Sequence, residues 1–228
     1  MAPLRESPTT VLTDPAGLEA LLPSLGLNDG APQLFPDELR PQLGRGLRFR
    51  QYPEQLARYL VHLSTLGVRR YMEVGVQHGG TFVVTVEYLS RFMPIERAVA
   101  VDLLNVPALR RYEELRPGAR FLREDSSSRA FADFVQREGP FDLVLIDGDH
   151  SREAVRRNWE TVRPHARAVA FHDIVDAYCP GVRETWQELR REEADAYDFH
   201  EFTAHYPEVT AREGDTFLGL GLGVRRTG

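Results

Sequence analysis

Acidic residues and histidines follow two apolar runs of the sequence, at the point where each run ends. The first group comes directly after residues 141–146, and the second comes directly after residues 168–171. The four side chains concerned are Asp147, His150, His172 and Asp173. Carboxylates and imidazoles bind divalent metals, and a histidine beside such a site can accept a proton from a substrate hydroxyl. One such residue alone is more often a helix cap, but two groups after consecutive runs favour a functional site.

The four side chains converge only if the two apolar runs are neighbouring strands of one sheet. Parallel strands end at the same edge, so the two groups would then face each other across that edge. Buried carboxylates without a partner are costly. The cluster therefore requires a cation or strong hydrogen-bond donors.

A glycine-rich segment, residues 73–81, joins a third apolar run to a helical pattern. Glycines allow the backbone to approach a ligand closely, and the amino terminus of a helix offers free N–H groups. The spacing differs from the G-x-G-x-x-G of dinucleotide-binding loops, since Val76 and His78 would crowd a pyrophosphate. A tight turn without a ligand is the alternative interpretation of this segment alone. The candidate cofactor-binding residues here are Glu73, Gly75, Gly79, Gly80 and Thr81.

Asp102 ends another apolar run, 22 residues after Gly80. At that distance an acidic side chain can accept hydrogen bonds from both hydroxyls of a ribose. A helix cap is the alternative, but the glycine loop before it favours an adenosine-containing cofactor. Asp125 and Ser126 are placed to reach an adenine ring or, equally, to cap a helix. Asp147 is a candidate cofactor contact as well as a metal ligand.

These residues meet only if strands and helices alternate, and the sequence predicts that they do. Apolar residues at helical spacing from Leu56 to Leu63 predict a helix that begins at Pro53. Predicted strands cover residues 71–76, 98–102, 120–122, 141–146, 168–171 and 216–224, and predicted helices cover 81–92, 107–116, 128–137, 152–162 and 181–193. This alternation predicts a doubly wound, mostly parallel α/β sheet, whose ligands bind beyond the carboxyl ends of the strands.

Composition narrows the function. The 228-residue chain has a net charge of −6, and its arginines are interspersed with acids, which argues against binding to nucleic acid. It contains no lysine, which excludes pyridoxal-phosphate Schiff bases and a phosphate-loop lysine. The single Cys179 excludes an internal disulfide, and we expect it to be a spectator thiol without a partner. There is no apolar leader segment and no membrane-length apolar run, so we predict a cytoplasmic protein without a membrane partner.

Residues 1–50 differ from the rest of the chain. They hold seven of the 15 prolines and only short apolar clusters. We interpret them as an irregular or partly helical arm that acts as a lid or an oligomer contact. Residues 51–228 are expected to form the functional domain.

Five short motifs together resemble class I S-adenosylmethionine-dependent methyltransferases, in particular the group of macrolide sugar O-methyltransferases and cephalosporin-hydroxylase-like proteins. The motifs are Gln51-Tyr52-Pro53, Glu73-x-Gly75-x-x-x-Gly79-Gly80-Thr81, Ile146-Asp147-Gly148-Asp149-His150, Phe171-His172-Asp173 and Gly181-Val182. The resemblance covers residues 48–224, and the aspartate–histidine motifs are the most specific. It implies a Rossmann-like three-layer sandwich with seven strands, the last antiparallel, and a methyl donor lying over Gly75 and Asp102.

The resemblance also implies roles at the strand ends. In metal-dependent members, the positions of Asp147, His172 and Asp173 hold magnesium, and the position of His150 supplies the base. Some members carry Glu-Asp where this chain has His172-Asp173. Because magnesium prefers oxygen ligands, His172 either lies behind the ligands or favours manganese, iron or zinc.

We therefore expect a metal-assisted O-methyltransferase that acts on a hydroxyl of a small molecule, such as a sugar, a polyketide or a catechol-like natural product. The arm and residues 197–206, which carry four aromatic side chains, would form the acceptor pocket or a mobile lid. The alternatives are a metal-dependent oxygenase using His150, His172 and a carboxylate, and a non-catalytic protein that binds S-adenosylmethionine. An NAD-dependent oxidoreductase is disfavoured because its glycine fingerprint is missing.

Overall fold

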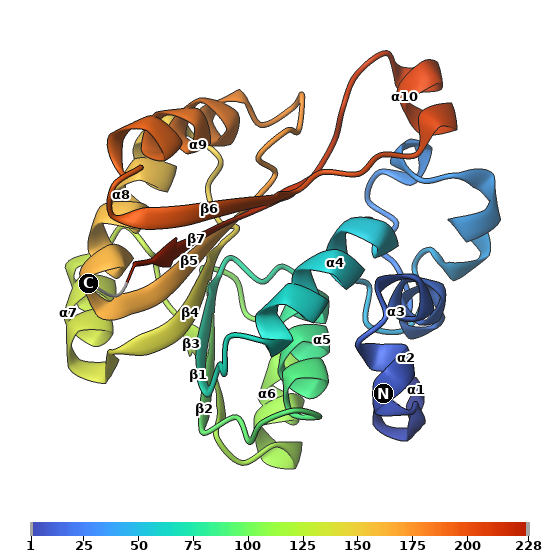
Figure 1. Cartoon of the computed structure of the whole chain (residues 1–228). Coiled ribbons are helices and arrows are strands. Elements are labelled where there is room, and N and C mark those ends of the chain that lie inside the picture. The colour runs from blue at the N-terminus through green and yellow to red at the C-terminus, as the bar shows by residue number, and fades with distance from the viewer. Residues whose placement is uncertain (1, 227–228) are drawn as a thin grey trace.

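The computed structural model describes residues 2–226, and a seven-stranded sheet forms its centre (Figure 1). The strands are β1 (Arg70–Val74), β2 (Arg97–Asp102), β3 (Ala119–Arg123), β4 (Phe141–Ile146), β5 (Ala166–His172), β6 (Tyr197–Phe202) and β7 (Leu220–Arg225). Their order is β3-β2-β1-β4-β5-β7-β6, and β7 pairs antiparallel with both of its neighbours while the other pairs are parallel. The predicted sheet, with its last strand antiparallel, is confirmed.

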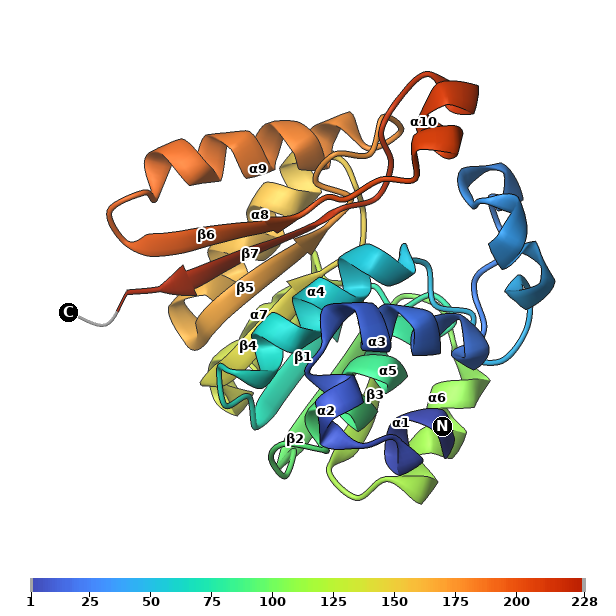
Figure 2. The same cartoon turned by 45° about the vertical axis from the view of Figure 1, so that its right-hand side comes forward.

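Alternation along the strands divides the core between two helical layers (Figure 2). In β1, Tyr71 packs with one layer while Met72 and Val74 pack with the other. The first layer contains α4 (Pro53–Ser64), α5 (Gly80–Leu89) and α6 (Pro107–Leu115), and the second contains α7 (Arg129–Glu138), α8 (Arg152–Val162) and α9 (Pro180–Glu192). Successive side chains of a strand point to opposite faces, so each strand supplies both layers. The fold is the expected Rossmann-like three-layer sandwich.

The order of the strands places a switch point between β1 and β4, where chain connections leave in opposite directions. Gly75 follows β1 there, with a φ of 83°, and a Cβ at this position would lie 2.1 Å from the carbonyl oxygen of Asp147 after β4. Only glycine fits such an approach of two backbones. The loops that follow β1 and β4 are thereby packed directly against each other at the carboxyl edge of the sheet.

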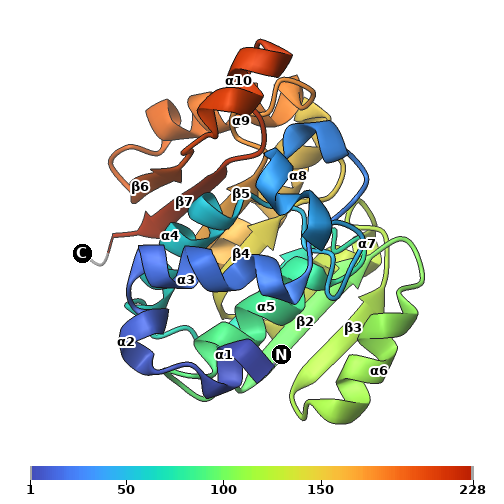
Figure 3. The same ribbon diagram turned by 90° about the vertical axis from the view of Figure 1, so that its right-hand side faces the viewer.

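Residues 2–50 are largely ordered helical turns packed on the first layer (Figure 3). They form α1 (Ala2–Glu6), α2 (Thr9–Leu12), α3 (Pro15–Leu21) and the 3₁₀ turns η1 (Leu22–Leu25), η2 (Pro32–Leu34) and η3 (Asp37–Gln42). Leu4, Leu12 and Leu18 are fully buried in the same core cluster as α4 and α5. The hydroxyl of Tyr88 on α5 donates a hydrogen bond to the carbonyl of Leu12. Whether this segment is a lid or an oligomer contact stays a prediction.

The structure corrects the expectation that residues 197–206 form the acceptor pocket or a mobile lid. Its first six residues form the edge strand β6, and Tyr197 and Phe199 pack against Trp159 and Trp186 beneath α8 and α9. Aromatic residues at alternate positions are typical of a strand with one buried face. The prediction considered the number of aromatic residues and overlooked their alternation. The loop beyond leads to α10 (Pro207–Glu213), where Arg212 donates hydrogen bonds to the carbonyls of Gln33 and Phe35.

Two further features complete the fold. The short 3₁₀ turn η4 (Arg163–His165) leads from α8 into β5. The final strand begins at Leu220, later than predicted, because the preceding loop folds back to pair with Val175 and Ala177.

Between residues 2 and 226, none of the helices combines the length and apolar character needed to cross a bilayer.

Substitution of two glycines tests the backbone contact at the switch point. Gly75 and Gly214 both have positive φ, but only Gly75 is crowded, since a Cβ on Gly214 would meet nothing within 4 Å. We expect Gly214→Ala to cost about 1 kcal/mol of unfolding free energy from strain alone, and Gly75→Ala to cost about 2–3 kcal/mol more from the collision. Urea unfolding of both variants measures the difference. Equal losses would show that the loops after β1 and β4 separate without penalty.

Candidate active site

A cavity of about 660 Å³ opens at the carboxyl edge of the sheet, and most of the predicted residues line it. The predicted residues on its wall are Gly75, Gly80, Thr81, Asp102, Asp125, Ser126, Asp147, His150, His172 and Asp173. They come from the ends of β1, β2, β3, β4 and β5, as expected for an α/β sheet. The volume lies in the range of small-molecule and cofactor sites.

Asp102 holds the glycine loop in place. Its Oδ2 atom accepts hydrogen bonds from the backbone N–H groups of Val76 and Gln77, both at 2.9 Å, and its Oδ1 accepts one from Leu104 at 2.8 Å. A carboxylate has about four acceptor positions, so roughly one remains for a ligand. Asp102 can therefore accept a hydrogen bond from a ribose, but its expected capacity for two hydroxyls is reduced by the loop.

The amino terminus of α5 fits closely against the segment before α4. A Cβ on Gly80 would lie 2.3 Å from the carbonyl oxygen of Leu47 and 2.6 Å from the backbone nitrogen of Phe49. A side chain at Gly80 would push residues 47–49 outward. The glycine thus allows the amino-terminal segment to form part of the cavity wall.

Glu73 and Gly79, two predicted cofactor contacts, do not line the cavity. Glu73 is 1% exposed and accepts a hydrogen bond from the Tyr71 hydroxyl within the core. Burial raises the pKa of its carboxyl to about 8, although the Tyr71 hydrogen bond opposes this. A side chain at Gly79 would face Leu109 of α6. Both residues therefore support the glycine loop from its core side. Side chains at these two positions are directed away from the edge of the sheet where the cavity lies.

Asp125 and Ser126 line the cavity after β3. Asp125 accepts a hydrogen bond from the backbone of Ser127, while the cap of α7 is Ser128, whose hydroxyl accepts from Phe131. The helix-cap alternative for Asp125 and Ser126 is therefore wrong. Contact with an adenine ring stays a prediction for both.

Two carboxylates converge on the imidazole of His172. Its Nδ1 lies 2.8 Å from Asp173 Oδ1 and 3.3 Å from Asp147 Oδ1, and the ring is 2% exposed. Its Nε2 lies 2.9 Å from the carbonyl oxygen of Arg50, so that nitrogen must donate. In the neutral ring this leaves the Nδ1 lone pair directed at the carboxylates.

The charges of His172, Asp147 and Asp173 stabilise one another. Burial alone would lower the pKa of His172, but Asp147 and Asp173 outweigh it and raise that pKa to about 9. Burial opposes ionisation of Asp173 too, yet His172 and then His150 hold its pKa at about 2. Without another cation, the cluster is stable as an imidazolium between two carboxylates.

Several buried atoms of the cluster lack a hydrogen bond. They include His172 Nδ1, Asp173 Oδ1 and His150 Nε2. His172 Nδ1 and Asp173 Oδ1 are close, but their orientation does not make a hydrogen bond. Asp173 also has a φ of 63°, a strained conformation of the kind found at binding sites. The grouping of Asp147 with the unsatisfied atoms of His172 and Asp173 fits a divalent cation. The nitrogen ligand suits manganese, iron or zinc better than magnesium.

His150 stands at the opposite side of the same cluster and is 39% exposed to the cavity. Its Nε2 lies 3.6 Å from Asp147 Oδ1 and 3.5 Å from Asp173 Oδ2. Interaction with Asp147, and then the charge of Asp173, raises the pKa of the ring against the effect of burial. The structure thus brings Asp147, His150, His172 and Asp173 together, as the two strand-end motifs predict.

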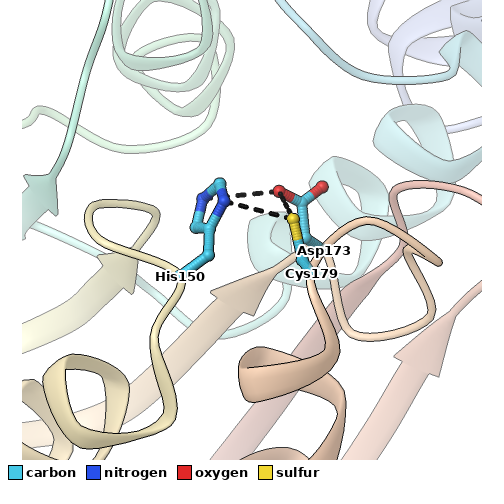
Figure 4. Close-up of side chains that lie close together, drawn as sticks. All are labelled: His150, Asp173 and Cys179. Carbon is cyan, nitrogen blue, oxygen red and sulfur yellow. Dashed lines mark hydrogen bonds and ion pairs between the residues drawn. The ribbon is translucent and has the colours of Figure 1, made fainter.

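The expectation that Cys179 has no partner is wrong. Its Sγ lies 3.1 Å from His150 Nδ1 and 3.5 Å from Asp173 Oδ2 (Figure 4). Cys179 immediately precedes α9, which follows β5, and such a helix begins at the ligand-binding edge. The position of Cys179 directly before this helix could therefore have indicated that it lies near the site. No comparable sequence pattern predicts Arg48, Arg50 and Arg157, which also line the cavity.

Residues 72–174 match a family described as a methyltransferase domain. The mycinamicin VI 2''-O-methyltransferase of Micromonospora griseorubida is 30% identical over 137 residues, which is 58% of this chain and 31% of that protein. The chain thus matches less than a third of the length of this curated relative.

Solved structures share the fold. TomG, an O-methyltransferase from Streptomyces achromogenes involved in tomaymycin synthesis and solved in complex with SAM, has a TM-score of 0.56 and 14% identity, covering 78% of this chain and 82% of its own. MycE, a methyltransferase of the mycinamycin pathway solved with Mg, SAH and mycinamycin VI, has a TM-score of 0.51 and 20% identity, covering 74% of this chain and 48% of its own. At these identities the likeness establishes the fold alone.

The buried carboxyl of Glu73 makes stability depend on pH. Its pKa is about 8 in the folded protein against 4.5 ordinarily, so the folded state binds more protons than the unfolded state between about pH 4.5 and 8. Stability is therefore lost as pH rises through that window, at up to ~1.4 kcal/mol per pH unit. Glu73→Gln keeps the shape without the ionisation, so we expect it to become increasingly more stable than the wild type from about pH 5 to pH 8.

Urea unfolding across this pH range measures the effect, with Glu160→Gln on the exposed face of α8 as the matched control. The control should follow the wild type at every pH. A constant difference between Glu73→Gln and the wild type would contradict the assignment of the raised pKa.

Proposed function

We propose that this chain methylates a hydroxyl of a small molecule, using S-adenosylmethionine as the methyl donor. The match of residues 72–174 to a methyltransferase domain and the Rossmann-like fold shared with solved O-methyltransferases support this proposal. One observation carries the proposal. A single cavity runs from the glycine loop and Asp102 to the cluster of His150, His172 and Asp173. A site for an adenosyl donor and a site that can activate a hydroxyl thus share one cavity.

The donor half is formed by the loop after β1 and the end of β2. In this proposal, Gly75 and Gly80 let the backbone lie close to S-adenosylmethionine, and the remaining acceptor position of Asp102 receives a ribose hydroxyl. Asp125 and Ser126 contact the adenine. A sulfonium methyl is already activated, so the principal task of these residues is to hold it in line with the acceptor oxygen and away from water.

The acceptor half is formed by the strand ends of β4 and β5. Asp147, His172 and Asp173 would hold a divalent cation, and the unsatisfied buried atoms His172 Nδ1 and Asp173 Oδ1 support this assignment. A bound cation lowers the pKa of a hydroxyl that contacts it. The structure of MycE contains magnesium, whereas the nitrogen ligand from His172 in this chain favours a transition metal such as manganese.

His150 is proposed as the general base. It is the most exposed histidine of the cluster, it lines the cavity, and its Nε2 makes no hydrogen bond. Cys179 at Nδ1 holds the ring in position. General base catalysis contributes about 10²–10⁴-fold to rate.

The acceptor class follows from the chemistry and from the relatives. The mycinamicin enzyme and MycE are methyltransferases of a macrolide pathway, and MycE was solved with mycinamycin VI. Vicinal hydroxyls can approach a cation together and present one oxygen to the methyl group. We therefore propose a sugar-bearing or phenolic small molecule as acceptor, and a cytoplasmic location.

Titration calorimetry tests the donor half. S-adenosylmethionine should bind the wild type with micromolar affinity, NAD should not bind, and Asp102→Asn should weaken donor binding at least about tenfold, since one charged hydrogen bond is worth about 1.5–3 kcal/mol. The exposed Asp133→Asn is the control and should bind as the wild type does. Unfolding curves show whether Asp102→Asn keeps its glycine loop. Tighter binding of NAD than of the donor would overturn the proposal.

Kinetics with a panel of hydroxylated acceptors test the base. His150→Gln should lower kcat by about 10²–10⁴-fold while the Kd for S-adenosylmethionine stays within about twofold, because His150 lies in the acceptor half. His200→Gln, which removes a ring that lies against His62 away from the cavity, is the control. An unchanged kcat in His150→Gln would remove His150 from the mechanism.

A further inference from the structure

A second group of metal-binding side chains adjoins the first and shares one residue with it. His150, Asp173 and Cys179 each offer a ligand atom, and these atoms lie within 4.8 Å of one another. The first group contains Asp147, His172 and the same Asp173. The two oxygens of Asp173 are divided between the groups, with Oδ1 toward His172 and Oδ2 toward His150 and Cys179.

The chemistry of the second group differs from that of the first. A thiolate is a soft ligand that selects zinc and similar metals, whereas magnesium requires oxygen atoms. A cysteine, a histidine and a carboxylate with one open position is a ligand set that suits zinc. We propose that His150, Asp173 and Cys179 form a zinc site that competes with the catalytic role of this cavity.

The distances are close to those of a tetrahedral centre. With zinc–sulfur and zinc–oxygen bonds of about 2.3 and 2.1 Å, the sulfur and oxygen ligands stand about 3.6 Å apart. Cys179 Sγ and Asp173 Oδ2 are 3.5 Å apart. The sulfur and His150 Nδ1 are 3.1 Å apart, so the imidazole must move outward by roughly 0.5 Å to complete the same geometry.

The surroundings of the group also favour a cation. Asp173 is 4% exposed, and its Oδ2 lies 3.5 Å from both His150 Nε2 and Cys179 Sγ, so a buried carboxylate oxygen is directed at the other two ligand residues. Cys179 is 7% exposed and does not line the cavity, whereas His150, which lies beside it in Figure 4, does. A metal ion can therefore enter through the cavity and meet the imidazole first, with the thiol completing the site from within. Binding displaces the thiol proton, because the thiolate is the ligand.

The site implies inhibition, and this consequence rests on the proposed function. Zinc bound at His150 Nδ1 keeps the ring proton on Nε2, so Nε2 can no longer accept the proton of the substrate hydroxyl. Zinc held by Asp173 also draws one carboxylate away from the neighbouring group. Methyl transfer supported by magnesium or manganese is then blocked by zinc. The binding of zinc itself is independent of whether the protein is a methyltransferase.

Cobalt spectroscopy of the full chain tests the site. Co²⁺ replaces zinc and shows a strong near-ultraviolet absorption only when a thiolate binds it, and Cys179 is the single cysteine of the sequence. We expect this absorption to saturate at one equivalent of Co²⁺ and to vanish on addition of zinc. Cys179→Ser and Cys179→Ala should lack it. His150→Gln should keep the band but weaken Co²⁺ binding at least about tenfold, while His200→Gln should match the wild type.

The outcomes separate the two proposals. No thiolate band in the wild type, or a Co²⁺ affinity unaffected by His150→Gln, would overturn the zinc site even if methyl transfer is found. A band with the expected dependence on His150 and Cys179, without any methyl transfer, would support the zinc site and remove the proposed function. Zinc inhibition of a working enzyme, with half-maximal loss at the zinc concentration that displaces Co²⁺, would support both.

Discussion

The closeness of two carboxylates to one buried imidazole is the interaction around which this site is organised. Asp147 and Asp173 follow adjacent parallel strands, so the sheet itself forces their charges together in a medium where repulsion is poorly screened. His172 lies between them, and the carbonyl of Arg50 fixes its orientation from outside. The site thus depends on a backbone group of the amino-terminal segment, although all its ionisable members belong to the sheet domain. Without the hydrogen bond to the Arg50 carbonyl, the His172 ring would be free to turn. The carboxylates of Asp147 and Asp173 would then lack a partner in a fixed position.

The amino-terminal segment is consequently more than an addition to the domain. Its leucines are buried in the same core as α4 and α5, and residues 47–49 pack against Gly80 where α5 begins. Both halves of the cavity, the glycine loop and the carboxylate cluster, therefore have one wall made from residues that precede α4. A division of the chain at residue 50 follows the sequence composition, but the packing of the core crosses it.

Much of this arrangement could be predicted from the sequence, for identifiable reasons. Strands β4 and β5 are buried on both faces, so each is a nearly continuous apolar run that ends sharply in polar residues, and the meeting of His150 with Asp173 follows from parallel pairing. Other features depend on contacts that a linear pattern does not contain. The position of Cys179 depends on where α9 starts, and the edge strand β6 has one half-exposed face, so its aromatics resembled a lid. The three backbone hydrogen bonds of Asp102 belong to loop geometry that residue types alone do not specify.

Those hydrogen bonds have a consequence for recognition. Asp102 is fixed by Val76, Gln77 and Leu104 whether or not anything lies in the cavity, so its rotamer freedom is already lost when the chain folds. A ligand that meets this carboxylate does not have to order it, and the entropy of ordering does not reduce the affinity. The same bonds make the acceptor direction of the free lone pair rigid. The carboxylate therefore selects ligands by the position of their hydroxyl group. A ligand whose hydroxyl lies elsewhere cannot be accommodated by rotation of the Asp102 side chain.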